Sequence, residues 1–179
     1  ALMAAVAAGI LLLGEKPDAG ATGAPAKAVA GRGYYLYLSE IEVEGTDASG
    51  NSWDARGGAP DLAYEIRWRG ATVYRSSTVS DALLARWSLA AIGLDNVSGG
   101  VSRESTVRAA RIHVGEGEEV EISVVDSDVT FDDPVAKWTC KVASLDIGST
   151  ALALPAGRVR RAVIVLRPFE DVNAGDLLK

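Results

Sequence analysis

The chain has 179 residues, of which 48% are apolar, and it carries a formal net charge of −6. An acidic surface repels the phosphates of nucleic acids, so this charge argues against nucleic-acid binding. The sequence contains one cysteine and one histidine. It therefore excludes an internal disulfide and lacks the several His or Cys ligands that zinc, copper and non-haem iron sites usually need.

The first segment, Ala1–Gly14, is an uncharged apolar run. It is shorter than the roughly 20 residues that cross a bilayer as a helix. Three interpretations are open: the end of an uncleaved membrane anchor that starts before residue 1, the core of a signal peptide, or a helix that docks on a partner. We expect the anchor, which would hold the protein at a membrane.

The next segment, Glu15–Gly33, is rich in Ala, Gly and Pro and shows no apolar periodicity. Such a composition cannot form a core, so it predicts a linker. The linker would tether a globular domain over Tyr34–Glu170, which ends in a short tail, Asp171–Lys179. We expect this domain on the periplasmic or another extracytoplasmic side, with the orientation left open because the charges that would set it are not in the sequence.

From Tyr34 onward the chain is predicted to consist of β-strands. The clearest signal is the alternation of Tyr64, Ile66 and Trp68 with charged residues, the period-two pattern of a strand with one buried face. Gly, Asn, Asp and Pro clusters separate further candidate strands at Glu40–Glu44, Thr72–Arg75, Thr106–Val114, Val120–Val125, Lys137–Val142 and Val159–Leu166. Seven or eight short strands at this spacing predict an all-β fold, an antiparallel β-sandwich.

One segment of the predicted domain is ambiguous. Ser80–Leu94 is compatible with a helix that Ser80 would cap, and it is also compatible with a strand over Arg86–Leu94. It is the only helix candidate within the domain.

Two aspartates follow the strand predicted over Val120–Val125, one residue apart at Asp126 and Asp128. Side chains at i and i+2 of a strand point the same way, so the two carboxylates would share one space. Two carboxylates held together repel, so that one is protonated or a cation lies between them. Hard oxygen ligands of this kind suit calcium. The pattern therefore indicates binding rather than catalysis.

Two acidic loops and a tryptophan occur in a defined order along the domain. Ser52–Ile66 contains Asp54, a Gly-rich turn and then Asp61 at a strand start, and Trp87 follows a Ser/Thr-containing segment. The second acidic loop contains Asp126, Asp128 and either Asp132 or Asp133. This order resembles the C-two domain, a calcium-dependent phospholipid-binding β-sandwich of eight strands, over about Tyr34–Phe169.

The resemblance is partial. The segment around Trp87 lacks the Pro and Asn of the family pattern, and the Ile-Gly pair that follows the second acidic loop is replaced by Val135 and Ala136. The first loop is a residue longer and the second a residue shorter than usual. The resemblance implies a set of calcium ligands: Asp54, Asp61, Asp126, Asp128 and Asp133. The alternative is that these are turn residues whose carboxylates bond to nearby backbone amides.

Catalytic chemistry has little support in the sequence. His113 closes a predicted strand, and no Gly-x-Ser-x-Gly elbow accompanies it. The acidic loops supply paired carboxylates, as a glycosidase needs, but no residues of a substrate cleft are evident. The aromatic residues favour contacts instead, because Trp53 lies in a Gly-rich loop and Tyr and Trp are favoured at membrane and protein interfaces.

These observations predict a membrane-tethered binding module without enzymatic activity. We expect an accessory or structural subunit that docks on a larger membrane protein complex, with the apolar segment as one contact and the sandwich loops as another. The alternative is a calcium-regulated phospholipid-binding module, and a hydrolase is the least favoured class. Calcium is the one cofactor that the resemblance implies, and no small-molecule substrate is indicated.

Overall fold

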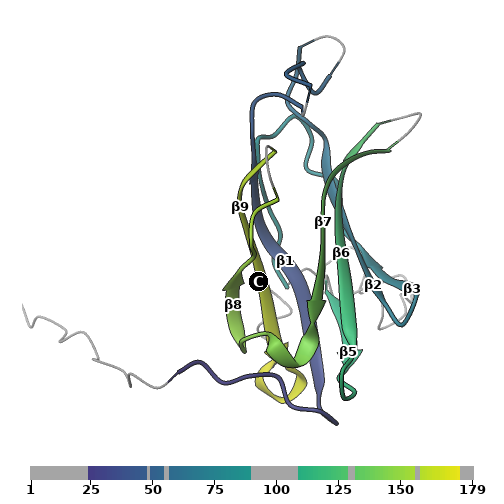
Figure 1. The fold of residues 1–179 in the computed structure, drawn as a ribbon, viewed down its shortest axis with the longest axis vertical. Coiled ribbons are helices and arrows are strands. Elements are labelled where there is room, and N and C mark those ends of the chain that lie inside the picture. Colours follow the sequence, from purple (N-terminus) through teal and green to yellow (C-terminus); the bar gives the residue numbers. More distant parts are fainter. Residues whose placement is uncertain are drawn as a thin grey trace, which may run out of the picture.

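The computed structural model describes residues 24–47, 49–54, 57–89, 109–128, 132–155 and 158–173. In these residues nine strands form two antiparallel sheets that pack face to face (Figure 1). The apolar segment Ala1–Gly14, expected as a helix, lies outside the described residues. Within them, no helix has the length and apolar character needed to cross a bilayer.

The larger sheet has the strand order β4-β1-β9-β8, with β5 also paired with β1. Its strands are β1 (Gly33–Val43), β4 (Leu84–Arg86), β5 (Ala110–His113), β8 (Gly148–Ala151) and β9 (Val159–Pro168). The smaller sheet has the order β3-β2-β6-β7. Its strands are β2 (Leu62–Trp68), β3 (Ala71–Arg75), β6 (Glu119–Ser127) and β7 (Asp132–Lys141). Two 3-10 helices, η3 (Val142–Ser144) and η4 (Phe169–Asp171), follow β7 and β9.

Two of the short strands share one position in the larger sheet. A strand has two hydrogen-bonding edges, and β9 pairs with β1 along almost the whole length of β1. The other edge of β1 pairs with β4 at Glu40–Glu42 and with β5 at Gly33–Leu36. The strands β4 and β5 therefore lie end to end, and each sheet is four positions wide. This arrangement confirms the predicted eight-stranded antiparallel β-sandwich, with one position divided between two strands.

The core lies between the sheets and follows the predicted alternation. In β2, Leu62, Tyr64 and Ile66 are fully buried. In β6, buried and half-buried residues alternate from Val120 to Ser127. The buried apolar side chains of both sheets form one continuous cluster. Burial of one face of each strand is the main stabilising term for such a sandwich.

The ambiguous segment is not helical where it is described. Of Ser80–Leu94, residues 80–89 are described, and they contain the short strand β4 and no helix. The Trp87 N–H donates to the Ser39 carbonyl at 3.0 Å, which continues the contact with β1. The helix interpretation is wrong over these residues because the free edge of β1 offers backbone partners that local propensity does not register. The strand β8, made of small and polar residues, was not predicted.

Residues 26–32, at the end of the predicted linker, are docked on the sandwich, and we call them the strap. The Ile147 N–H donates to the Ala26 carbonyl at 2.7 Å, and the Ala28 N–H donates to the Leu145 carbonyl at 3.1 Å. These bonds flank an antiparallel bridge between residues 27 and 146. The strap therefore pairs with the segment between η3 and β8 as a strand would.

Side chains reinforce the strap. Lys27 Nζ lies 2.5 Å from the carboxylate of Asp146. Ala28 is 8% exposed and belongs to the core cluster, whereas the neighbouring Val29 is 51% exposed. A second ion pair joins Arg32 to Glu170. A segment of low hydrophobicity is thus fixed mainly by backbone bonds, two ion pairs and one small buried side chain.

We expect Ala28→Asp to lower the free energy of unfolding by about 2 kcal/mol, because it buries a polar group without a partner. Urea unfolding measures the change. Val29→Asp is the matched control, since its side chain is exposed one position along. Equal stability of the two variants would show that the strap is not part of the folded unit.

Candidate functional site

The predicted ligands gather at one end of the sandwich, where β1 and β6 end and β2 begins. We call this end the loop pole and define it by the described residues Asp54, Asp61, Asp81, Asp126 and Asp128. It is the upper end in Figure 1, opposite the strap. The strand order places it there, because β6 runs antiparallel to β2 and pairs Asp126 with Leu62.

Three of these aspartates form a chain of bonds to backbone amides, which we call the carboxylate relay. Asp126 Oδ1 accepts a hydrogen bond from the Asp61 N–H at 2.7 Å. Asp61 Oδ1 accepts from the Asp81 N–H at 2.8 Å, and Asp81 Oδ1 accepts from the Ala59 N–H at 2.9 Å. The relay joins the end of β6, the start of β2 and the loop between β3 and β4. It braces the loop pole with the protein's own groups.

The sequence did not single out Asp81, which joins two parts of the relay. Its backbone has a φ of 51°, in the left-handed region that Asp and Asn adopt more readily than most residues. In the sequence, Asp81 follows Ser80, and such a Ser-Asp pair suits a helix N-terminus as well as a turn. The sequence therefore did not show that Asp81 holds the loop between β3 and β4.

Asp126 is the electrostatic centre of the loop pole. It is 1% exposed and is the one buried charged residue in the described part of the chain. Burial raises the pKa of its carboxyl group, the hydrogen bond from the Asp61 N–H opposes this, and the charges of Asp128, Asp54 and Asp61 raise the pKa further. Four of the five predicted ligands therefore lie close enough to interact, as the i, i+2 spacing of Asp126 and Asp128 suggested.

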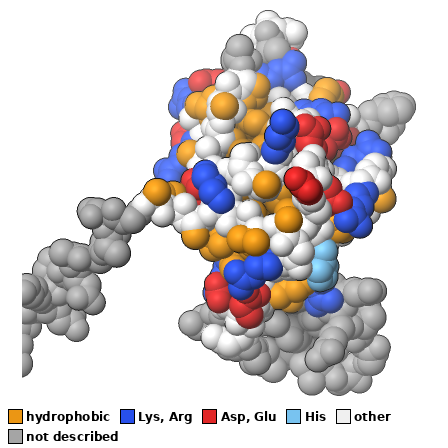
Figure 2. Space-filling model, turned by 60° about the horizontal axis from the view of Figure 1, so that its bottom comes forward, with side chains coloured by type: hydrophobic (Ala, Val, Ile, Leu, Met, Phe, Trp, Pro, Cys, Tyr) orange, Lys and Arg blue, Asp and Glu red, His pale blue; other side chains and the backbone are white. Residues whose placement is uncertain are grey.

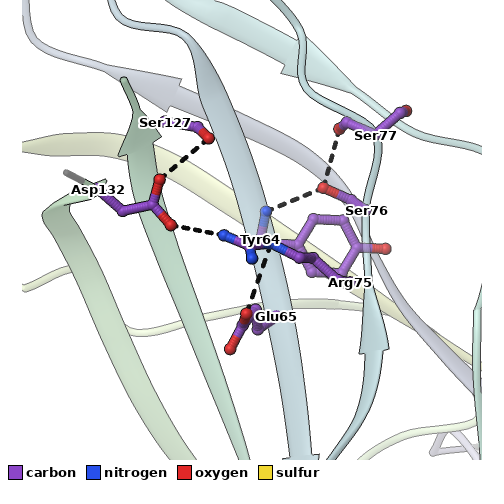
Figure 3. Close-up of polar contacts among 7 residues, drawn as sticks. All are labelled: Tyr64, Glu65, Arg75, Ser76, Ser77, Ser127 and Asp132. Atoms are coloured by element: carbon purple, nitrogen blue, oxygen red, sulfur yellow. Dashed lines mark hydrogen bonds and ion pairs between the residues drawn. The ribbon is translucent and has the colours of Figure 1, made fainter. Parts of the chain in front are cut away.

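The fifth predicted ligand, Asp133, lies on β7 as the register partner of Asp126 and is exposed. Its neighbour Asp132 is already paired: Arg75 Nη2 lies 2.5 Å from Asp132 Oδ2, and Ser127 Oγ bonds Asp132 Oδ1 at 3.1 Å (Figure 3). Arg75 also lies 3.5 Å from the Glu65 carboxylate. Asp132 thus contributes to a surface ion-pair network that ties β7 to β3 across the smaller sheet.

The chemistry of the loop pole suits calcium, but the described residues do not assemble a metal site. Carboxylate oxygens are the ligands that calcium prefers, and a cation would offset the repulsion around Asp126. No group of three or more Asp, Glu, His or Cys side chains within the described part of the chain is arranged to hold a metal ion. Relay bonds to backbone N–H groups are the interactions that the structure shows. The ligand set stays a prediction.

Apolar side chains flank the loop pole. Leu83 and Leu84 are 41% and 38% exposed at the start of β4, next to the relay. Trp53, expected as an exposed anchor, is half-buried and packs against the core, and its indole N–H donates to the Glu44 carbonyl at 2.7 Å. The exposed apolar surface beside the loop pole is therefore supplied by leucines rather than by the tryptophan.

His113 lies at the opposite end of the sandwich. It pairs in register with Gly33, and its ring packs edge-on against Phe169 with 5.3 Å between the ring centres. Figure 2, turned to bring this end forward, shows the histidine at the surface. The fold therefore places the one histidine and the loop carboxylates about a strand length apart, so they do not form a joint acid–base site.

No protein-family model and no curated protein sequence matches the chain. Solved structures do match it. Human GIVD cytosolic phospholipase A2, in complex with a fluorophosphonate inhibitor and terbium chloride, matches with a TM-score of 0.51 and 12% identity, over 78% of this chain and 18% of that chain. A C-two domain matches with a TM-score of 0.48 and 13% identity, over 76% of this chain and 98% of that chain. Calcium-bound extended-synaptotagmin 2 matches with a TM-score of 0.48 and 16% identity, over 79% of this chain and 46% of that chain.

At these identities the matches speak for the fold alone, and the argument rests on the phospholipase match, whose TM-score exceeds 0.5. Together with the two four-position sheets, it supports a divergent C-two-like fold for the chain, as the resemblance in the sequence implied. The chain spans less than a fifth of the phospholipase and less than half of the synaptotagmin chain.

Asp126 is both the acceptor for the Asp61 N–H and a buried charge close to other carboxylates. In the absence of metal, these two properties predict different results for two substitutions. Asp126→Asn keeps an oxygen that accepts the Asp61 N–H and removes the charge, so we expect unfolding free energy at pH 7 to stay equal or rise. Asp126→Ala leaves that N–H unpaired and should lose about 2 kcal/mol. Urea unfolding in the presence of a chelator measures both. A large loss in both variants would contradict the relay.

The pH dependence follows from the sign of the shift. The raised pKa of Asp126 means that the folded state holds its proton to higher pH than the unfolded state. The stability that the protonated Asp126 carboxyl group contributes is present below the pKa of the unfolded state, and it is lost as pH rises through the pKa of the folded state. We expect Asp126→Asn to remove this loss. Unfolding curves at a series of acidic pH values would then show a free energy of unfolding that falls less with rising pH, or rises more, than in the unaltered chain.

Proposed function

We propose that this protein is a non-enzymatic binding module, held at a membrane by its N-terminal segment, that docks as an accessory or structural subunit on a larger membrane protein complex. The observation that carries the proposal is the loop pole, where exposed Leu83 and Leu84 adjoin the carboxylate relay. Apolar side chains within a charged rim are the composition of a protein interface.

The negative charge of the loop pole indicates which kind of partner it would bind. The loop pole concentrates carboxylates in a protein that is acidic as a whole. Such a surface is complementary to a basic protein surface and is repelled by anionic lipid unless a cation intervenes. Two modest contacts, the N-terminal segment and the loop pole, would bind tightly together because the first raises the effective concentration of the second.

Separate variants test the two contacts. We expect deletion of Ala1–Gly14 to release the protein from membranes. Leu83→Asp with Leu84→Asp should leave it on the membrane but abolish recovery of its partner. Affinity purification of the tagged full chain from solubilised membranes, followed by mass spectrometry, measures recovery.

The control is Val73→Asp, an exposed apolar position on β3 in the other sheet. It should leave partner recovery unchanged. Unaltered recovery with the double leucine variant would exclude the loop pole as the docking surface.

A calcium-regulated phospholipid-binding module is the second candidate, and Asp126 favours it. A buried carboxylate near Asp54, Asp61 and Asp128 is a site where a bound cation removes repulsion. Asp54, Asp61, Asp126, Asp128 and Asp133 would hold the ion. Calcium would also neutralise the loop pole and so permit contact with anionic lipid.

We expect calcium at about 100 times its Kd to stabilise the fold by about 2.7 kcal/mol if it binds this site. Thermal unfolding with and without calcium, with magnesium in parallel, gives the shift. Asp126→Asn with Asp128→Asn should abolish it, and Asp171→Asn, at the other end, should not. Flotation with vesicles containing phosphatidylserine tests the lipid contact. The absence of any calcium-dependent shift at millimolar concentrations would exclude this candidate.

A further inference from the structure

The two ends of the sandwich are distinct, and the strap determines which of them is attached. From this, and resting on the proposed membrane tether, we infer that the sandwich stands on its strap end, so that the loop pole contacts its partner away from the membrane that holds the N-terminal segment. The loop pole would then contact a protein surface that lies away from the bilayer, either projecting from that membrane or facing it.

The strap fixes the attachment point at the end opposite the loop pole. Beyond its pairing with the segment before β8, the Gly31 N–H donates to the Val114 carbonyl at 2.8 Å, and the Val114 N–H donates to the Arg32 carbonyl at 3.0 Å. Val114 directly follows β5 at the start of β1. The chain therefore leaves the sandwich beside the first residues of β1, whereas the loop pole lies beyond its last residues (Figure 1).

The length of the sandwich and the reach of the linker disfavour contact between the loop pole and the membrane that holds the N-terminal segment. The 11 residues of β1 span about 35 Å at about 3.3 Å per residue, and the loops lie beyond them. Residues 15–25 reach at most about 39 Å at about 3.5 Å per residue, whatever their conformation. End-on contact of the loop pole with the membrane that holds Gly14 would thus require a linker stretched to its limit.

Among the described residues of the smaller sheet, Val73 is the one large apolar side chain that is exposed, and a single valine is too little to hold the sandwich on its side. Ion pairs cover much of the exposed side of this sheet: Lys137 Nζ lies 2.8 Å from Glu121, and Arg67 lies 3.9 Å from the same carboxylate. Cross-strand pairs of this kind balance charge and remain hydrated. Neither anionic nor zwitterionic lipid gains much from this face, so this face does not oppose an upright orientation.

Energy transfer to lipid headgroups tests the inference. Single cysteines are placed at Lys141→Cys, near the strap end, and at Ser80→Cys, at the loop pole, both in a Cys140→Ser background. Each labelled full chain is bound to vesicles that contain a headgroup-linked acceptor. We expect transfer from position 141 to exceed transfer from position 80 several-fold. Equal transfer, or greater transfer from position 80, would overturn the inference.

A second way of attaching the chain to vesicles tests the orientation separately from the membrane tether. In parallel chains a histidine tag replaces Ala1–Gly14, and vesicles with nickel-chelating lipid bind it, so the linker keeps its length. Failure of the native chain to float with vesicles counts against the membrane tether, whereas loss of the difference on nickel vesicles counts against the orientation. Doubling residues 15–25, or freeing the strap with Ala28→Asp, should reduce the difference.

Discussion

The hydrogen bond between the Asp126 carboxylate and the Asp61 N–H is the constraint on which the loop pole depends. It joins the end of β6 to the start of β2 and carries the relay on to the loop that precedes β4. The bond is demanding because Asp126 is buried while other carboxylates lie nearby, which disfavours its ionised form. A buried charge of this kind persists only where its hydrogen bonds are satisfied, so the backbone amide of Asp61 determines how the acidic residues are arranged.

The strand β1 connects the two ends of the sandwich. It pairs with β9 on one edge and with β4 and β5 on the other, so its first residues meet the strap end and its last residues meet the loop pole. The split edge position explains how the described residues form nine strands within an eight-position sandwich. Because one strand pairs along its whole length with its neighbours, the strap and the loop pole are held in a fixed relation at opposite ends of the sandwich.

The sequence predicted those parts whose causes are local. Alternation revealed β2 and β6, and the spacing of Asp126 and Asp128 brought their charges together. It did not reveal β8, because Gly-Ser-Thr-Ala pairs through its backbone and offers no apolar pattern. The strap was hidden for the same reason: its Ala- and Gly-rich sequence is typical of a linker, and backbone bonds to residues 114 and 145–147 fix it. The relay could not be foreseen, because its donors are amides of residues far away in the chain.

One arrangement of carboxylates can serve both candidate functions, and the presence of a cation decides between them. Without a cation the relay holds the loops through backbone amides and presents an acidic surface with exposed leucines, which suits a basic protein partner. With calcium the same oxygens would exchange repulsion for coordination, and the neutralised surface would no longer repel anionic lipid. In both cases the strap holds the opposite end, so whatever the loops bind is approached from the far side of the sandwich. If the proposed membrane tether holds, the partner is to be sought among surfaces that project beyond the membrane, and calcium would change the chemistry of that contact while its direction stays the same.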